Sequence, residues 1–375
     1  MSQNKIPVCE PLLNGNECKY VADAVETGWI SSSGEYVKKF ENMFSNYCDT
    51  EYGIAVCNGT VALHLALLAL GIGKGDEVIV PSFTMISTAF AVCYVGAMPV
   101  FVDADPKTWN IDVTKIEEKI TSRTKAIIPV HIFGNPCNMY KIRELADKYN
   151  LFVVEDAAEA HGATFDGKKV GSFSEIACFS FFANKNITTG EGGMCVTSSK
   201  EYERLCRYYK NVCFNPDGPR DYLHNDIGYN YRMSNLHAAI GLAQTEKADE
   251  YKYKRIHNHK EYKNLLLKTP GIVFQEDEKN CENVGWMNAI VVEPNKYGKT
   301  RDDLIRYLNE NGVETRLLFK SMHIQPALLK YGCDGSGEYP VTEWLSDNGL
   351  YLPSASSLKS QDIEYICDLI DSFSD

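Results

Sequence analysis

The 375-residue sequence predicts an α/β protein, with a large doubly wound and mostly parallel sheet followed by a smaller α+β C-terminal domain. Apolar, β-branched runs alternate along the chain with segments of helical pattern, which is the order expected of parallel strands joined by helices. In addition, the run Leu151 to Glu155 holds four successive apolar residues before its carboxylate, as in strands that are covered on both faces.

The expected elements of the large sheet follow this alternation in order. They are a helix at Val61–Leu70, strand Glu77–Val80, helix Met85–Val95, strands Pro99–Val102 and Lys125–Val130, helix Met139–Tyr149, and strands Leu151–Glu155, Phe173–Phe181 and Gly193–Thr197. Because helices connect successive parallel strands, we expect them on both faces of the sheet.

The second half of the chain changes character. The segment Asn215 to Asp221, NPDGPRD, has the proline and glycine content of a surface loop. A long helical pattern then runs from Ser234 to about Leu267. We take its middle as the boundary between a large domain, residues 1–245, and a small domain, residues 246–375.

Composition excludes several classes of partner. Thirty-eight basic and fifty acidic residues give a net charge of −12, which argues against nucleic acid because phosphate backbones bind basic surfaces. The longest apolar stretch, Phe90–Val102, is interrupted by Gly96 and Pro99 and is too short to span a bilayer. Thirteen cysteines occur without a CxxC pair or a secretory signal. We therefore expect reduced thiols, no metal site, no membrane contact and a cytoplasmic protein.

The segment Phe179 to Gly193, FSFFANKNITTGEGG, places one lysine between an apolar strand and a glycine-containing turn. An amine attacks carbonyl groups only when burial or a neighbouring cation lowers its pKa. Lys185 follows a run that is expected to be buried, so this lowering is available. The alternative is a solvated loop lysine, which is the commoner case for a lysine taken alone.

A carboxylate stands at the end of another expected strand. Asp156 follows Leu151–Glu155 and lies at the carboxyl end, where ligands bind to parallel sheets. A buried carboxylate requires a cation, and the pyridinium nitrogen of pyridoxal 5'-phosphate (PLP) is such a cation. A carboxylate in this position can equally cap the following helix.

Asn58, Gly59 and Thr60 precede the helix expected from Val61 to Leu70. A glycine and a hydroxyl at a helix N-terminus present free backbone N–H groups to an anion such as a phosphate. The segment is neither a Walker A loop nor a GxGxxG fingerprint. Taken alone, it is also compatible with an ordinary helix cap.

A phosphate seat, an acid for a ring nitrogen and a reactive lysine thus occur in this chain order. With these features the sequence resembles the DegT/DnrJ/EryC1/StrS sugar aminotransferases, which are PLP enzymes of fold type I, the aspartate aminotransferase-like fold. The resemblance covers nearly the whole chain. Its segments are IPVCEPLLNGNE, GWISSSG, NGTVALHLAL, GDEVIVPSFT, PVFVDAD, EDAAEAHGA, FSFFANKNITTGEGG and GYNYRMSNLHAAIGLAQ.

The resemblance implies roles for the residues that match the family's motifs. Lys185 would bind PLP as a Schiff base and then shuttle a proton, and Asp156 would pair with the ring nitrogen. The other implied cofactor contacts are Gly59, Thr60, Met85, Ala158, Glu159, Ser180 and Asn230. Met85 replaces a common aromatic residue, and Glu159 replaces a common glutamine. The second subunit usually supplies the residue at Asn230, which implies a homodimer with shared active sites.

The expected nucleotide-sugar contacts come from two separate segments. They are Trp29, Ser31 and Ser32 in GWISSSG, and Arg316 and His323 in ETRLLFKSMH. An arginine can pair with a diphosphate, and a histidine can hydrogen-bond to a phosphate or a sugar. Each residue has a structural alternative: a core tryptophan, a surface salt bridge or a histidine with internal partners.

By the same resemblance, the expected reaction transfers an amino group from L-glutamate, through pyridoxamine 5'-phosphate, to C4 of a nucleotide-linked 4-keto-6-deoxysugar. The lysine segment is most similar to the subgroup that uses GDP-4-keto-6-deoxy-D-mannose and forms GDP-perosamine and 2-oxoglutarate. Related dehydratases carry histidine in place of Lys185, so transamination is expected here. Two alternatives stay open: a dTDP- or UDP-linked 4-keto-6-deoxyglucose as substrate, and a non-catalytic PLP-binding regulatory protein.

Overall fold

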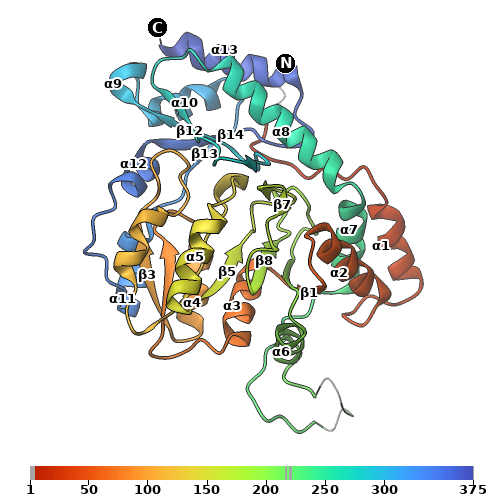
Figure 1. The fold of residues 1–375 in the computed structure, drawn as a ribbon. Helices are drawn as coiled ribbons and strands as arrows, with labels where there is room; N and C mark the ends of the chain where they lie inside the picture. The colour runs from red at the N-terminus through yellow and green to blue at the C-terminus, as the bar shows by residue number, and fades with distance from the viewer. Residues whose placement is uncertain (1–4, 216–217, 219–221, 375) are drawn as a thin grey trace.

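The computed structural model describes residues 5–215, 218 and 222–374, so most of the loop expected at Asn215–Asp221 lies outside the described residues. Figure 1 shows two regions, a large sheet flanked by helices and a group of C-terminal elements gathered above it. The helix α8 (Ala248–Leu265) runs between the two regions.

The large sheet has seven strands in the order β1-β9-β8-β5-β4-β2-β3. The strands are β1 (Tyr52–Val56), β2 (Glu77–Pro81), β3 (Met98–Val102), β4 (Thr124–Ile127), β5 (Phe152–Asp156), β8 (Ile176–Ser180) and β9 (Gly193–Thr197). The pairings from β8 through β5, β4 and β2 to β3 are parallel, whereas β9 is antiparallel to both of its neighbours. The mostly parallel sheet is confirmed, although β1 was not among the expected strands.

Helices cover both faces of this sheet because successive strand residues point to opposite sides. Ile54 and Val56 pack in one core and Ala55 packs in the other. The first core holds α3 (Gly59–Ala69), α4 (Ser87–Tyr94) and α6 (Lys200–Lys210). On the other face lie α2 (Glu35–Tyr47), α5 (Met139–Tyr149) and α7 (Asn235–Glu246), with α1 (Glu17–Glu26) packed on α7. The doubly wound architecture is confirmed.

The single helix expected from Ser234 to about Leu267 is wrong. The chain forms two helices, α7 and α8, which are separated at Lys247, where φ is −114° and ψ is 13°. The two helices bury their side chains against different partners, since α7 packs on α1 and α2 while α8 packs on the C-terminal helix α13 (Ser360–Ser374). A single straight helix could not pack against both sets of helices. The domain boundary placed after residue 245 stays a prediction.

The C-terminal sheet is antiparallel, with the order β10-β12-β14-β13. Its strands are β10 (Ile272–Phe274), β12 (Asn288–Val292), β13 (Arg316–Leu317) and β14 (Gly349–Leu352). One face packs against α8, α10 (Arg301–Glu310) and α13. The other face carries Ala289, Val291 and Tyr351, which share a core with Phe83 and Phe133 of the large sheet's loops. The small sheet therefore covers one edge of the large sheet.

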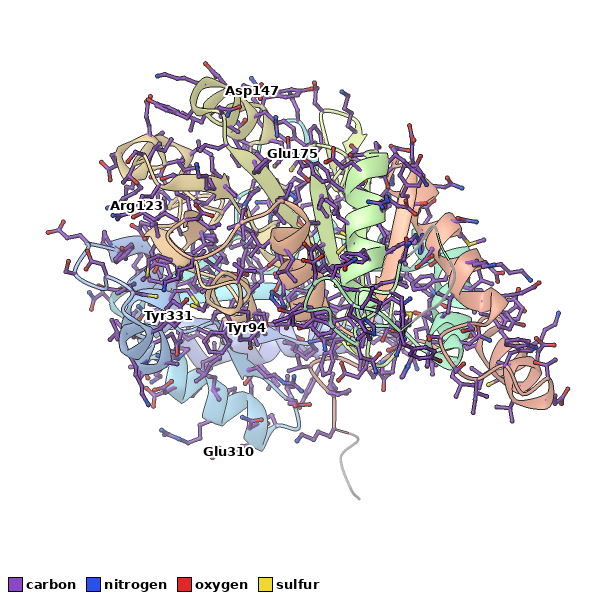
Figure 2. All side chains as sticks on the ribbon, turned by 90° about the horizontal axis from the view of Figure 1, so that it is seen from below. Tyr94, Arg123, Asp147, Glu175, Glu310 and Tyr331 are labelled. Atoms are coloured by element: carbon purple, nitrogen blue, oxygen red, sulfur yellow. The ribbon has the colours of Figure 1, made fainter. Side chains whose placement is uncertain are left out.

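Short elements complete the described chain. They are β6 (Thr164–Phe165), β7 (Lys168–Lys169), β11 (Cys281–Glu282), α9 (Pro294–Tyr297), α11 (Pro326–Tyr331), α12 (Pro340–Asn348) and the 3₁₀ turns Val113–Lys115, Glu117–Lys119, Ile132–Gly134 and Met322–Ile324. The Tyr331 hydroxyl of α11 donates to the backbone oxygen of Cys93 at 3.1 Å, and Figure 2 labels Tyr331 beside Tyr94 of α4. Among the described residues, no helix combines the length and apolar character needed to cross a membrane.

The first described residues join the C-terminal sheet to the large domain. Ile6 donates its N–H to the Gly312 oxygen at 2.8 Å, and the Val8 oxygen accepts from the Ser354 N–H at 2.8 Å. The Cys9 thiol then lies 3.5 Å from the backbone oxygen of Asn184, the residue before Lys185. This N-terminal segment, residues 6–9, thus contacts both the C-terminal region and the lysine turn.

Candidate active site

The sheet topology brings the expected cofactor residues to one edge. Strand β8 is parallel to β5, and β1 runs in the same direction as β8 because each is antiparallel to β9. The carboxyl ends of β1, β5 and β8 therefore meet at the edge that the small sheet covers. Asn58, Asp156 and Lys185 all follow these ends.

Lys185 lies in a tight turn after β8. Its N–H donates to the Phe182 oxygen at 2.9 Å. Its side chain is only 10% exposed, and Nζ lies 4.0 Å from Oε1 of Glu159 and 3.7 Å from the centre of the Trp286 ring. Burial lowers the pKa of Lys185, while the carboxylates of Glu159 and Asp156 oppose that shift. Lys185 is therefore not a solvated loop lysine.

Asp156 ends β5 as a buried carboxylate. The Thr88 hydroxyl donates to its Oδ2 at 2.8 Å, and the Ala158 N–H donates to its Oδ1 at 3.3 Å. Burial raises the pKa of Asp156. No ion pair joins this carboxylate to a basic side chain within the described residues. A cation bound beside it would reverse the pKa shift.

The preceding carboxylate, Glu155, has a different environment. It accepts hydrogen bonds from the Gly171 N–H at 2.7 Å and the Ser174 hydroxyl at 2.7 Å. His131 Nδ1 accepts from the Cys137 N–H at 3.0 Å, so its Nε2 carries the hydrogen and donates to Glu155 at 3.2 Å. Glu155 therefore links β5 to His131 and to the segment around Gly171 and Ser174. Asp156 instead lies near Lys185.

An anion seat lies at the start of α3. The Asn58 side chain caps the helix by accepting from the Val61 N–H at 3.0 Å. Within the described chain, the N–H groups of Gly59 and Thr60 have no hydrogen-bond partner. A Cβ on Gly59 would lie 2.7 Å from the Cβ of Ser180, so only glycine lets β8 approach this closely. Free N–H groups at a helix N-terminus beside a serine hydroxyl suit a phosphate.

The remaining neighbours extend this site. The Thr60 hydroxyl donates to Oγ of Ser87 at 2.9 Å, which ties α3 to α4. Met85, 49% exposed, lies one turn before Thr88. Ala158 is half-buried next to Asp156, and Glu159 Oε2 accepts from the Phe133 N–H at 2.7 Å. All expected cofactor contacts except Asn230 thus gather at one edge of the sheet.

Asn230 lies away from this cluster in the single chain. It is exposed and pairs with Asn211 just beyond the end of α6. No recorded hydrogen bond or ion pair between described residues links it to the surroundings of Lys185. Its expected role as a cofactor contact therefore depends on a second subunit and stays a prediction.

The GWISSSG segment is also separate from the Lys185 cluster. Asn235 at the start of α7 donates from its side chain to the Trp29 oxygen at 2.5 Å and from its N–H to the Ser31 oxygen at 2.9 Å. The Trp29 side chain is 58% exposed, so the core alternative for this tryptophan does not hold. Ser32 lines a surface hollow between α2 and α6.

The two expected contacts in the C-terminal half have internal partners. Arg316 of β13 is exposed, with its guanidinium 3.5 Å from Glu314. His323 is buried, and its Nδ1 and Nε2 lie 2.8 Å from the Ser82 hydroxyl and 3.2 Å from Glu343. The structure therefore favours the internally partnered alternative for His323. Roles for both residues at the sugar stay predictions.

Three site residues were absent from the sequence-based expectation. Thr88 binds the oxygen of Asp156, Trp286 lies over the Lys185 amine, and its indole N–H donates to the Asn184 oxygen at 2.9 Å. Arg255 of α8 is buried and donates to the Trp286 oxygen at 2.8 Å. Thr88 lies four residues beyond the family segment GDEVIVPSFT. That segment was the only sequence feature that could have indicated Thr88. Trp286 and Arg255 reach the site through long-range packing.

The arrangement fits a phosphorylated pyridine aldehyde. The unpartnered N–H groups of Gly59 and Thr60 suit its phosphate, the buried carboxylate of Asp156 suits its ring nitrogen, and Lys185 suits its aldehyde. The fold and the site together define a PLP-dependent aminotransferase of fold type I.

Comparisons with known proteins agree with this class. The model of the DegT/DnrJ/EryC1/StrS aminotransferase family matches residues 11–371, and the chain belongs to this family. GDP-perosamine synthase of Escherichia coli O157:H7 is 45% identical over 98% of each chain, and that of Caulobacter vibrioides is 44% identical over the same shares. The crystal structure of DesV from S. venezuelae superposes with a TM-score of 0.93 at 31% identity, covering 100% of this chain and 99% of DesV. The chain is thus a PLP-dependent sugar aminotransferase family enzyme.

Proposed function

We propose that this enzyme transfers the amino group of L-glutamate to C4 of GDP-4-keto-6-deoxy-D-mannose, which gives GDP-perosamine and 2-oxoglutarate. The observation that carries the proposal is the 45% identity to a GDP-perosamine synthase over 98% of both chains. The lysine turn supports it, because Lys185 is present where the related dehydratases have histidine. A transaminase needs that amine as its base.

PLP, when bound, supplies the aldehyde that carries the amino group and the ring that accepts electrons. Gly59, Thr60 and Ser180 would hold its phosphate, and Asp156 would keep its ring nitrogen protonated. Thr88 fixes the Asp156 carboxylate from behind through the bond at 2.8 Å. Asp156 is 5% exposed and the Lys185 side chain is 10% exposed, so little water weakens the charge interactions of these two residues.

Lys185 would move the proton at the sugar carbon that receives the amine. To take a proton, its amine must be neutral, and burial lowers the pKa of Lys185 in that direction. To give a proton back, it must be protonated for part of the cycle, and the nearby carboxylates oppose complete loss of charge. This balance lets one amine act first as base and then as acid.

We further propose a homodimer in which Asn230 of one subunit completes the cofactor site of the other. The exposure of Asn230 in the single chain supports this arrangement. The test mixes two inactive variants, Asn230→Ala and Lys185→Ala, under conditions that exchange subunits. Shared sites predict that activity returns, because one site of each mixed dimer keeps both native residues. No return of activity would rule out a contribution of Asn230 across the interface.

The substrate assignment is tested by separating the two half-reactions. The enzyme is first converted to its pyridoxamine phosphate form with L-glutamate, and the amino donor is then removed. GDP-4-keto-6-deoxymannose and dTDP-4-keto-6-deoxyglucose are added separately, and the absorbance of the aldehyde form of the cofactor is followed. Fast return with the GDP sugar alone is the expected result.

The other outcomes discriminate between the alternatives. Return with the dTDP sugar alone would move the assignment to a 4-aminotransferase of glucose configuration. Failure with both sugars, after normal reaction with glutamate, would leave the aminotransferase class intact and exclude both substrates. Failure to react with glutamate would point instead to another amino donor or to a non-catalytic PLP-binding protein.

A further inference from the structure

The carboxyl group of Glu159 has one oxygen fixed and one oxygen available. Oε2 accepts a hydrogen bond from the Phe133 N–H at 2.7 Å, which sets the orientation of the side chain. Oε1 makes no hydrogen bond within the described part of the chain, and its nearest cation is Nζ of Lys185 at 4.0 Å. The side chain of Glu159 is 5% exposed and that of Lys185 is 10% exposed. The two groups therefore face each other with little competition from water.

The distance between Nζ and Oε1 can be closed without moving the backbone. The lysine side chain rotates about four carbon–carbon bonds, and a single water molecule also spans such a gap. The Glu159 carboxylate cannot move in the same way, because Phe133 holds its other oxygen. A fixed acceptor beside a mobile donor is the geometry that proton exchange requires.

The charged and titratable groups around this pair come from several elements. They are Asp156 of β5, Cys9 of the N-terminal segment, His161 after β5, Arg255 of α8 and Tyr351 of β14. Burial lowers the pKa of His161 to about 3, and burial raises the pKa of Tyr351. Burial also raises the pKa of Glu159, to about 7, and Asp156 contributes to the rise.

We propose that Glu159 is a second acid–base residue of this site, which exchanges one proton with Lys185 during the catalytic cycle. The proposal deepens the proposed function, on which it rests, by adding a proton acceptor for the lysine. In the exchange, an N–H bond of the Lys185 ammonium breaks and an O–H bond forms at Oε1 of Glu159. The ion pair thereby becomes a neutral amine and a neutral carboxylic acid, and the reverse step restores the ammonium.

The surroundings explain why the lysine needs such a partner. The Trp286 ring, 3.7 Å from Nζ, stabilises a positive charge on the amine. The side chains of Lys185 and Glu159 are 10% and 5% exposed, so an acceptor within the site is closer to the amine than bulk water is. Glu159 can accept the proton near neutral pH, because the pKa of its carboxyl lies at about 7. A glutamine would accept a hydrogen bond at this position and would not take the proton.

The first test observes the carboxyl group directly and uses no sugar. Infrared difference spectra of the holoenzyme, recorded as the pH crosses 7, should show a protonated buried carboxyl that is absent in Glu159→Gln. In Lys185→Met, the midpoint of this signal should rise by about one pH unit, because a nearby cation favours the charged carboxylate. No such signal, or an unchanged midpoint in Lys185→Met, would overturn the proposal.

The second test follows turnover against pH. In the native enzyme, turnover should fall as the pH drops through about 7, because a protonated Glu159 cannot accept. In Glu159→Gln, turnover at neutral pH should be about 10²-fold lower, and the decrease of turnover around pH 7 should be absent. If turnover of the variant fell at the same pH as that of the native enzyme, the titrating group would be another residue.

A matched control separates proton exchange from loss of folding. Glu117→Gln makes the same chemical change at a carboxylate on the surface, where it pairs with Lys148. This variant should keep the native pH profile and the infrared signal. Equal thermal stability of Glu159→Gln and the native chain would exclude unfolding as the cause of any loss. Because the infrared test needs no substrate, its outcome is independent of the sugar assignment.

Discussion

The residues around Lys185 and the residues expected at the nucleotide sugar differ in burial and in contact. Lys185, Asp156 and Glu159 are buried at one sheet edge, within reach of one another and of fixed hydrogen-bond donors. Trp29 and Arg316 are exposed and lie on separate elements. One chain therefore brings together the residues expected at the cofactor, whereas the residues expected at the sugar lie apart in the single chain.

The strongest way to test the first region is Lys185→Ala. Without the amine, the chain loses both the covalent attachment and the acid–base group, so turnover should fall by more than about 10⁴-fold. Steady-state assay with glutamate and the GDP sugar checks this. Lys125→Ala, at an exposed position of β4, should keep native turnover. Near-native turnover in Lys185→Ala would refute the assignment of the catalytic residue.

A smaller loss is expected from Asp156→Asn, which keeps the shape and removes the charge. Turnover should fall by about 10²-fold or more, since a preorganised charge is lost in a dry site. Thr88→Val removes the bond at 2.8 Å behind the carboxylate, together with a longer contact of 3.3 Å to the Thr84 hydroxyl, and should cost about tenfold. Single-turnover absorbance measurements compare the two. Equal losses would show that Asp156 acts through its position and not through its charge.

The anion seat predicts a smaller effect for Gly59→Ala than for Asp156→Asn. The added Cβ would lie 2.7 Å from the Cβ of Ser180, and such overpacking costs about 1–3 kcal/mol. Cofactor affinity should fall by about tenfold, as measured by titration of the cofactor-free chain. Gly73→Ala is the matched control, because its Cβ would meet only the Val95 oxygen at 3.7 Å. Unchanged affinity in Gly59→Ala would place the phosphate elsewhere.

The second region predicts an effect that is confined to one half-reaction. Arg316→Ala should raise the KM for the nucleotide sugar by about tenfold, which is the loss of one charge-assisted hydrogen bond. The half-reaction with glutamate should be unaffected. Arg306→Ala, at an exposed residue that pairs with Asp303, should change neither value. If Arg316→Ala slowed both half-reactions equally, Arg316 would stabilise the structure and would not bind the nucleotide sugar.

Much of the Lys185 region could be predicted because its signals are local. Asp156 and Glu159 come two and five residues after the last apolar residue of the run Leu151–Val154, and Lys185 follows another apolar run, so strand ends place them at one edge. The helix at Met139–Tyr149 and the strand at Gly193–Thr197 were predicted with the observed bounds. Strand β1 was missed because YGIAV is short and contains a glycine, which weakens a strand pattern.

The remaining features depend on contacts between distant segments. The chain between α7 and α8 reads as one helical pattern, and the break at Lys247 arises from two cores that lie in different directions. Trp286 reaches Lys185 from a loop before β12, and its sequence surroundings carry no cofactor motif. His323 has the residue type expected of a sugar contact, yet Ser82 and Glu343 occupy both of its nitrogens.

The N-terminal segment sets the order in which this protein becomes complete. The Val8 N–H bonds to Glu314 at 3.3 Å across 306 residues of sequence, and Cys9 lies against the lysine turn. Contacts of such separation form late, because the intervening chain must first be ordered. During translation, the large sheet can collapse while residues 6–9 still lack their partners. Because Gly312, Glu314 and Ser354 supply the partners of residues 6–8, the segment beside the lysine turn cannot be anchored until nearly the whole chain has left the ribosome.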